Sequence, residues 1–135
     1  MSAKVPIGTP WFWVAVQALV VLAETDAACP STTIASDLKT HAVFLRRVMA
    51  QLVRAEIVEA REGRDGGYRL AQPATQITLA DVYQATRALP QGDEEHECIR
   101  ATNASAQLAL KQVKQDLEHC RLEILGRYSI ASLMR

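Results

Sequence analysis

The sequence predicts a mainly α-helical fold with a small β-hairpin wing and a long C-terminal helix. Three observations predict it. Apolar residues recur at helical spacing in two neighbouring segments, 31–38 and 42–54. The period then shortens to two over residues 57–71, around a glycine-rich stretch. A pattern repeating every seven residues follows in 99–125. This order of elements is that of a winged helix-turn-helix domain followed by a dimerisation helix.

The first element expected is a helix from about Trp11 to Glu24, with Pro10 at the first helical position. It is apolar nearly all round, so we expect it to be buried between the winged domain and a further element, such as a partner's C-terminal helix. The three aromatic residues at 11–13 then belong to the core or an interface, and ligand stacking is the alternative. The apolar run is too short to span a bilayer.

The next two helices form the helix-turn-helix. Ser31 or Thr32 can cap the first helix with a hydroxyl. Residues 39–41 make the turn. The second helix is expected to bury Phe44, Leu45, Val48, Met49 and Leu52. Its opposite face carries Val43, Arg46, Arg47, Ala50 and Arg54. Guanidinium groups on the unburied face of such a helix suit the DNA major groove, where arginine bonds guanine edges or phosphates.

After Glu56 two short strands are expected, one at 57–60 and its return partner at 68–71. Gly63, Gly66 and Gly67 lie between them and permit the positive φ angles of a hairpin tip. The arginines on or beside this tip are placed to touch backbone phosphates or the minor groove. They are Arg61, Arg64 and Arg69.

The remaining chain is expected to be helical apart from one loop. Thr78 and Asp81 have the spacing of a capping box, and the helix they open runs to about Leu89. A polar, acidic loop covers 90–97. The longest helix follows, from about 99 to Leu125, and Gly126 is expected to end it. Residues 128–134 are expected to fold back. The helix carries a seam of residues that we expect to form a dimer interface: Asn103, Ala106, Leu110, Val113, Leu117, Cys120 and Ile124.

The sequence resembles the Rrf2 family of bacterial winged-helix transcriptional regulators, the group that contains the iron–sulfur cluster regulator. The resemblance rests on G-G-Y-R-L-A-Q-P at 66–73 and I-T-L-A-D-V at 77–82, together with I-A-x-x-L, F-L-x-x-V and L-V-x-A earlier in the chain. It covers 11–90 closely and the rest in outline. Two positions depart from the family pattern: Lys39 stands where many relatives carry glycine, and His41 replaces the serine that starts the second helix. The resemblance implies a DNA-binding regulator with the family fold, and the two departures leave the sequence of its DNA site unpredictable.

Composition agrees with this interpretation only when charge is considered locally. Half of the residues are hydrophobic, which disfavours disorder, and the formal net charge is zero. Between Lys39 and Arg69, however, seven basic residues face four acidic ones, while an acidic run lies at 93–97. Charge is therefore segregated along the chain, as a groove-binding face requires.

Cysteine usage indicates a reducing, cytoplasmic location, because three widely spaced cysteines form no disulfide framework. In cluster-binding members of the resembled family, three cysteines lie close together at the start of the dimer helix. Here Cys98 occupies a plausible first ligand position, but the candidates for the following ligand positions are Ala104 and Ser105, which cannot bind iron as thiolates do. We therefore expect no iron–sulfur cluster and no bound metal. A zinc site from His96, Cys98, His119 and Cys120 would need a bridge between subunits. Cys29, Cys98 and Cys120 remain candidates for thiol oxidation, against the alternative of small half-buried residues.

We therefore predict a sequence-specific DNA-binding transcriptional regulator. The expected form is a homodimeric repressor that binds a palindromic promoter site and is gated by thiol oxidation. Residues 1–90 form the DNA-binding domain and 91–135 the loop, dimerisation helix and C-terminal turn. The pattern of a nucleophile, base and orienting group is missing, so an enzyme is not expected. The alternatives are a cofactor-gated or iron–sulfur-gated regulator and a winged-helix module that binds proteins instead of DNA. The residues expected to contact double-stranded DNA are Thr32, Thr33, His41, Ala42, Val43, Arg46, Arg47, Arg54, Arg61, Arg64 and Arg69.

Overall fold

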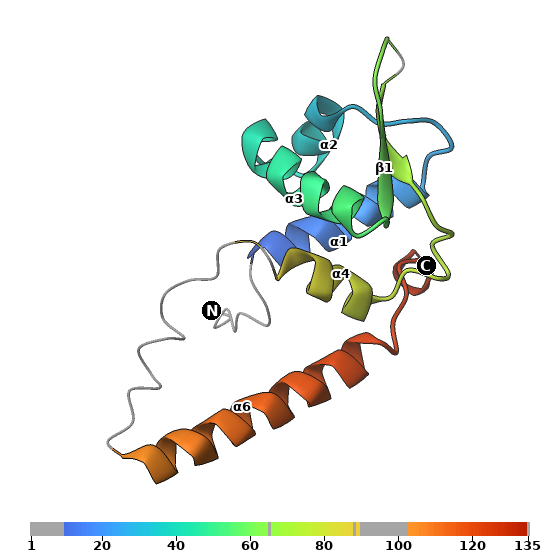
Figure 1. Cartoon of the computed structure of the whole chain (residues 1–135). Coiled ribbons are helices and arrows are strands. Elements are labelled where there is room, and N and C mark those ends of the chain that lie inside the picture. Colours follow the sequence, from blue (N-terminus) through green and yellow to red (C-terminus); the bar gives the residue numbers. More distant parts are fainter. Residues whose placement is uncertain (1–9, 65, 88, 90–102, 135) are drawn as a thin grey trace, which may run out of the picture.

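The structure is a computed structural model that describes residues 10–64, 66–87, 89 and 103–134. Its elements, labelled as in Figure 1, are α1 (Pro10–Ala23), α2 (Ser31–Asp37), α3 (Ala42–Arg54), β1 (Val58–Arg61), β2 (Gly67–Leu70), α4 (Leu79–Thr86), α6 (Ala104–Leu125) and a short 3-10 helix, η1 (Ala131–Leu133). The predicted order of helix-turn-helix, hairpin and long C-terminal helix is therefore confirmed. In Figure 1, α2, α3 and the hairpin gather at one end of the molecule and α6 extends at the other.

The core is built around α1, which packs on α3, α4 and β2. The expected burial of this helix is confirmed for most of its length: Phe12, Ala15, Val16, Ala18, Leu19 and Leu22 are buried. Trp13 differs, because 41% of its surface is exposed. Full burial of a leucine-sized side chain contributes about 1.5–3 kcal/mol, so this helix supplies a large part of the stability of the domain.

Helices α2 and α3 both end in a Schellman motif, with a non-glycine residue in the left-handed position. Lys39 has φ +53° after α2, and Glu56 has φ +61° after α3. The N···O distances of the closing bonds are 3.2 Å from Lys39 to Ser36, 2.9 Å from Thr40 to Ala35, 3.0 Å from Glu56 to Val53 and 3.0 Å from Ile57 to Leu52. The turn after α2 therefore has the left-handed geometry that favours glycine, although Lys39 occupies the position. The expected hydroxyl cap is wrong: Pro30 occupies the N-cap of α2 and no side chain caps that helix.

The hairpin joins the rest of the winged domain through close backbone contact at Gly67, the first residue of β2. Strands β1 and β2 pair antiparallel, with Val58 opposite Leu70 and Arg61 opposite Gly67. Gly67 has φ +144°, and a Cβ there would lie 2.3 Å from the carbonyl oxygen of Cys29. Gly63 also has a positive φ, as expected, but Gly66 does not. At Gly66 the requirement is space, because a Cβ would lie 2.6 Å from the Arg61 carbonyl oxygen.

The capping box that opens α4 is confirmed. Thr78 Oγ1 accepts from the Asp81 N–H at 3.1 Å, and the Thr78 N–H donates to Asp81 Oδ2 at 3.1 Å. The end of the chain folds back onto the same region, since the Ile130 N–H donates to the Ile77 carbonyl at 2.9 Å and Ile130 is fully buried. The C-terminal segment thus attaches the end of α6 to the start of α4.

Helix α6 begins at Ala104, where the Asn103 side chain accepts from the Ala106 N–H at 2.7 Å. The part of this helix expected at 99–103 and the acidic loop at 90–97 lie wholly or mostly outside the described residues. Gly126 is the C-cap, so the predicted end of the helix is confirmed, and it takes a right-handed conformation. Twenty-two residues span about 33 Å, and none of them is buried. Such a helix is not held in place by burial within one chain.

Replacing Lys39 by glycine is expected to raise the free energy of unfolding by about 0.5–1 kcal/mol, because glycine removes the Cβ clash of the left-handed conformation and loses part of that gain to backbone entropy. The control is Lys39→Ala, which removes the same charge and keeps the Cβ. Denaturant unfolding at one protein concentration measures both variants. Equal stability of the two variants would contradict this account of the turn.

Candidate nucleic-acid interface

Helix α3 separates an apolar face from an arginine face. Its buried side chains are Leu45, Val48, Met49 and Leu52, while Phe44 is only half-buried. The opposite stripe, Val43, Arg46, Arg47, Ala50 and Arg54, is exposed along its length. Val43 alone has 64% of its surface exposed. The helix therefore presents guanidinium groups on the face that the domain leaves uncovered, as insertion into a major groove would require.

One arginine of this face rests on an aromatic support that the sequence analysis missed. The Arg47 guanidinium carbon lies 6.0 Å from the centroid of the Trp11 ring. Trp11 in turn stacks on Phe44, with centroids 4.3 Å apart and planes at 20°. A cation–π contact at an exposed site is worth about 0.5–1 kcal/mol, which is enough to bias the direction of Arg47 without fixing it. The signal in the sequence was the aromatic run itself, assigned there to a core or an interface.

The remaining residues expected from the helix-turn-helix lie around the start of α3. Thr32 and Thr33 are exposed in the first turn of α2. His41 is exposed at the N-cap of α3 in an extended conformation, and its side chain makes no capping bond. Ala42 is half-buried. These positions place small and polar groups beside the arginine face, and contact with bases remains a prediction for each.

The wing divides its arginines into two kinds. Arg61 and Arg64 are exposed at the end of β1 and at the tip. Arg69 lies opposite Glu59 in the hairpin register, and its Nε donates to the Glu59 carboxylate. This ion pair is partly exposed and so worth no more than about 1 kcal/mol, but a phosphate would have to displace it. The structure therefore favours Arg61 and Arg64 over Arg69 as phosphate ligands.

The described cysteines differ in their surroundings. Cys29 precedes α2, and its backbone N–H and carbonyl both bond to Tyr68 at 2.8 Å. Partial burial, and then the charge of Asp37, raise the pKa of the Cys29 thiol above its usual value. This opposes the expected stabilisation of a thiolate near the start of α2, because reactivity follows the thiolate fraction. Cys120 is a free thiol exposed on α6, and Cys98 lies outside the described residues.

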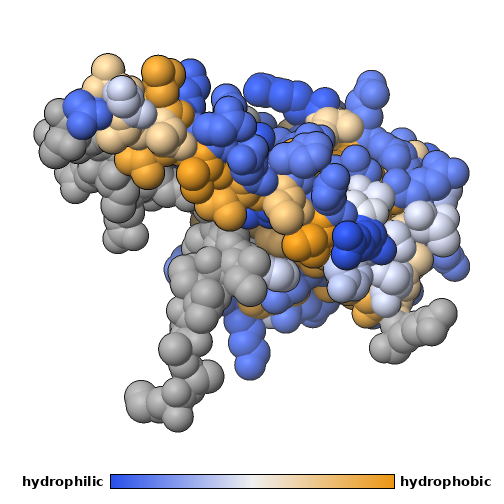
Figure 2. All heavy atoms as spheres, turned by 90° about the horizontal axis from the view of Figure 1, so that it is seen from below, coloured by the Kyte–Doolittle hydropathy of each residue, from blue (hydrophilic) through white to orange (hydrophobic). Residues whose placement is uncertain are grey.

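The exposed side of α6 carries the predicted seam. The exposed fractions are 42% for Leu110, 52% for Val113, 62% for Leu117 and 46% for Ile124, and Cys120 lies on the same face. Apolar side chains run along the arm that α6 forms when the molecule is seen from below (Figure 2). Leucine, valine and isoleucine side chains this exposed, in a row on one helix, are typical of a surface that another protein chain covers.

Within the ranges described, the structure brings together no group of three or more histidine, cysteine or carboxylate side chains that could hold a metal ion. Cys29 and Cys120 belong to separate elements, the loop before α2 and α6. An iron–sulfur cluster needs several such ligands at one point, so these residues do not fit one. None of the helices in the described part is long and apolar enough to cross a membrane.

Comparison with known proteins agrees with this geometry. A family model described as Rrf2, iron-dependent transcriptional regulator, matches residues 11–135. YwgB of Bacillus subtilis (strain 168), assigned as an HTH-type transcriptional regulator, is 31% identical over 111 residues, which cover 81% of this chain and 64% of YwgB. Protein aau3 of Rhizobium meliloti (strain 1021) is 33% identical over 98 residues, covering 69% of this chain and 61% of its own length. The chain thus spans less than two thirds of the length of either relative.

Solved structures share the fold. IscR of T. potens superposes with a TM-score of 0.68 at 21% identity, covering 99% of this chain and 88% of the other. The oxidised form of CymR from Staphylococcus aureus gives a TM-score of 0.69 at 17% identity, with 94% of each chain covered. Because the family model spans nearly the whole chain, and the winged fold with its exposed arginine helix is what such a protein needs, this chain belongs to the Rrf2 family of transcriptional regulators.

Proposed function

We propose that this chain acts in the cytoplasm as a homodimeric repressor that binds a palindromic promoter site, with the two α3 helices in successive major grooves. The observation that carries the proposal is the exposed arginine face of α3 beside an arginine-bearing wing. Arg46 and Arg47 are proposed to read base edges, and Arg61 and Arg64 to bind phosphates. A dimer seated across a promoter excludes other proteins from it, which supports repression as the outcome.

Dimerisation is supported by the α6 seam. Four large apolar side chains on that seam are 42–62% exposed in the single chain. Covering them would remove a large apolar surface from water, at roughly 25 cal/mol per Å². The symmetry of a homodimer would also match a palindromic site, since each half-site then meets an identical helix.

Thiol gating is a second, finer proposal, and Cys120 is the residue that supports it. Cys120 is exposed on the seam, where two copies could approach each other across a dimer axis. Oxidation would join the two sulfur atoms, with two protons and two electrons passing to an oxidant such as a peroxide. Cys29 is a weaker candidate, because burial and Asp37 raise its pKa.

Arg46→Ala is expected to weaken binding to a selected site by about 1–3 kcal/mol and to relax specificity at one position, whereas Arg64→Ala weakens binding to all sequences and lowers the salt slope by about one ion. Fluorescence anisotropy with DNA selected from a random pool, over a range of salt concentrations, measures both. Arg127→Ala, an exposed arginine beyond α6, is the matched control. Unchanged affinity and slope in both test variants would show that DNA docks elsewhere or not at all.

Leu117→Glu is expected to convert the dimer to a monomer, because it places a charge at the centre of the seam. The matched control is Leu108→Glu: Leu108 is 70% exposed on the same helix but lies roughly 160° around it from the seam. Sedimentation analysis of both variants reads out the mass. If both variants stay dimeric, or the native chain is monomeric, the seam is not the interface.

Mild peroxide treatment is expected to give a covalent dimer on non-reducing gels in the native chain and in Cys29→Ser, but not in Cys120→Ser. Affinity for the selected site, measured before and after oxidation and again after reductant, tests whether the bond gates binding. Monomer on every gel together with unchanged affinity would remove thiol gating and leave DNA binding untouched.

A further inference from the structure

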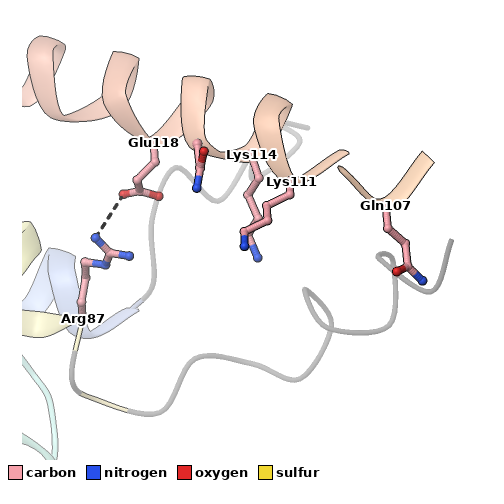
Figure 3. Close-up of a pocket in the computed structure, with 6 residues that line it drawn as sticks. Arg87, Gln107, Lys111, Lys114 and Glu118 are labelled. Atoms are coloured by element: carbon pink, nitrogen blue, oxygen red, sulfur yellow. Dashed lines mark ion pairs between the residues drawn. The ribbon is translucent and has the colours of Figure 1, made fainter. Parts of the chain in front are cut away.

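A basic hollow lies between the end of α4 and the inner side of α6. Its volume is about 580 Å³, and it is lined by Arg87, Gln107, Lys111, Lys114, Gln115 and Glu118. Pockets that bind small molecules commonly have volumes of about 300–1,000 Å³. Lys111 and Lys114 extend from α6 toward the same side as Arg87, which rises from the other wall (Figure 3). The hollow therefore has the size of a ligand site and gathers positive charge from two elements.

The positive charge in this hollow is poorly compensated. Glu118 is the acidic residue among the described lining residues. Its carboxylate also pairs with Arg121, with 3.4 Å between Nη1 and Oε2. Arg87 lies 3.9 Å from Glu118 Oε1, too far for a hydrogen bond, and this buried oxygen accepts no hydrogen bond from a described residue, so the pair is weak. Neither Lys111 nor Lys114 forms an ion pair with any residue that the structure describes. Three cations can therefore turn toward a ligand.

Lys111 and Lys114 also repel each other electrostatically. They lie three residues apart on α6 and so are neighbours on one helix face, where like charges repel. An anion between them and Arg87 would replace repulsion by charge-assisted hydrogen bonds. The amide of Gln115, also on α6, provides a further donor group of the kind that orients an oxyanion.

The hollow is separate from both surfaces already described. At about 100° per residue, its lining on α6 is centred roughly 120° around the helix from the seam of Leu110, Val113, Leu117 and Ile124. Helix α3 lies with α2 and the hairpin at the other end of the molecule from α6 (Figure 1). A ligand in the hollow thus competes directly neither with a partner's α6 on the seam nor with DNA on α3.

The wall that carries Arg87 belongs to the junction between the winged domain and α6. Arg121 of α6 donates to the Tyr83 hydroxyl of α4 at 2.7 Å. The guanidinium carbons of Arg121 and Arg87 lie 5.5 Å and 5.9 Å from the centroid of the Tyr83 ring. Since α4 also packs on α3, a ligand that draws Arg87 toward α6 acts on the joint that sets the DNA-binding helix relative to the dimer helix.

We propose that this hollow is an effector site for a small polyanion, a molecule with two or more carboxylate or phosphate groups, held by Arg87, Lys111 and Lys114. The binding of an anion depends only on the geometry and charge of the hollow. Its regulatory effect rests on the proposed function, because it requires a chain that binds DNA.

The first experiment titrates the native full chain with citrate and with pyrophosphate by calorimetry, at constant ionic strength, with chloride as reference. Binding of citrate, of pyrophosphate or of both supports the proposal and identifies the preferred group. Lys111→Gln with Lys114→Gln is expected to weaken binding by about tenfold or more, and Lys111→Arg with Lys114→Arg to retain it. The matched control, Lys39→Gln with Arg127→Gln, removes two charges from exposed positions outside the hollow and the DNA-binding face, and should bind the probe as the native chain does.

Three results would overturn the site: no heat beyond that of chloride, equal binding in the Lys111/Lys114 glutamine variant, or loss of binding in the Lys39/Arg127 control instead. Circular dichroism confirms that each variant is folded. Should the glutamine variant unfold, Arg87→Gln, which removes the third cation from the other wall and is also expected to weaken binding, supplies the comparison.

The second experiment measures affinity for selected DNA with and without saturating probe. A change of about fivefold or more in the native chain, absent in the Lys111/Lys114 glutamine variant, supports an effector role. Normal DNA binding that ignores a bound probe overturns that role and leaves the proposed function standing. A bound probe with no DNA binding under any condition overturns the proposed function and leaves the anion site standing.

Discussion

The packing of α1 against α3, α4 and β2 is the contact on which the rest of the structure depends. By covering the apolar face of α3, it decides that the arginine face is the one left exposed. Its first turn also supplies Trp11, which supports Arg47. The hairpin is fixed to the same body at Gly67, where only a residue without a Cβ can approach Cys29. Recognition helix and wing are thereby held at one end of a single core.

Helix α6 has the opposite character, since it buries none of its side chains within the chain. Its attachment is polar on one side, through Arg121 and Tyr83, and apolar at its end, through the buried Ile130. A helix held in this way leaves its seam available to a second copy and its inner side available to a ligand. The formal net charge of zero conceals a segregation of charge along the chain, because seven basic and four acidic residues lie between Lys39 and Arg69 while an acidic run lies at 93–97.

Much of the fold could be predicted from the sequence because local rules agreed with the tertiary structure. Helical periodicity identified the buried and exposed faces of α3, and the Thr78–Asp81 spacing identified the start of α4. Rules failed where a distant contact decided the outcome. Gly66 is required by the Arg61 carbonyl and not by its own φ, and Arg69 is paired across the hairpin with Glu59. The Arg47–Trp11 contact and the basic hollow join residues far apart in the chain, and no spacing pattern announces them.

In the proposed complex, two identical recognition helices meet one DNA duplex together. Hydroxyl-radical footprinting on DNA selected from a random pool tests it most directly. The account predicts two protected patches related by a two-fold axis, with centres separated by about one helical turn, roughly 10 base pairs, or a multiple of it. A single protected patch at full occupancy, without such symmetry, would contradict it.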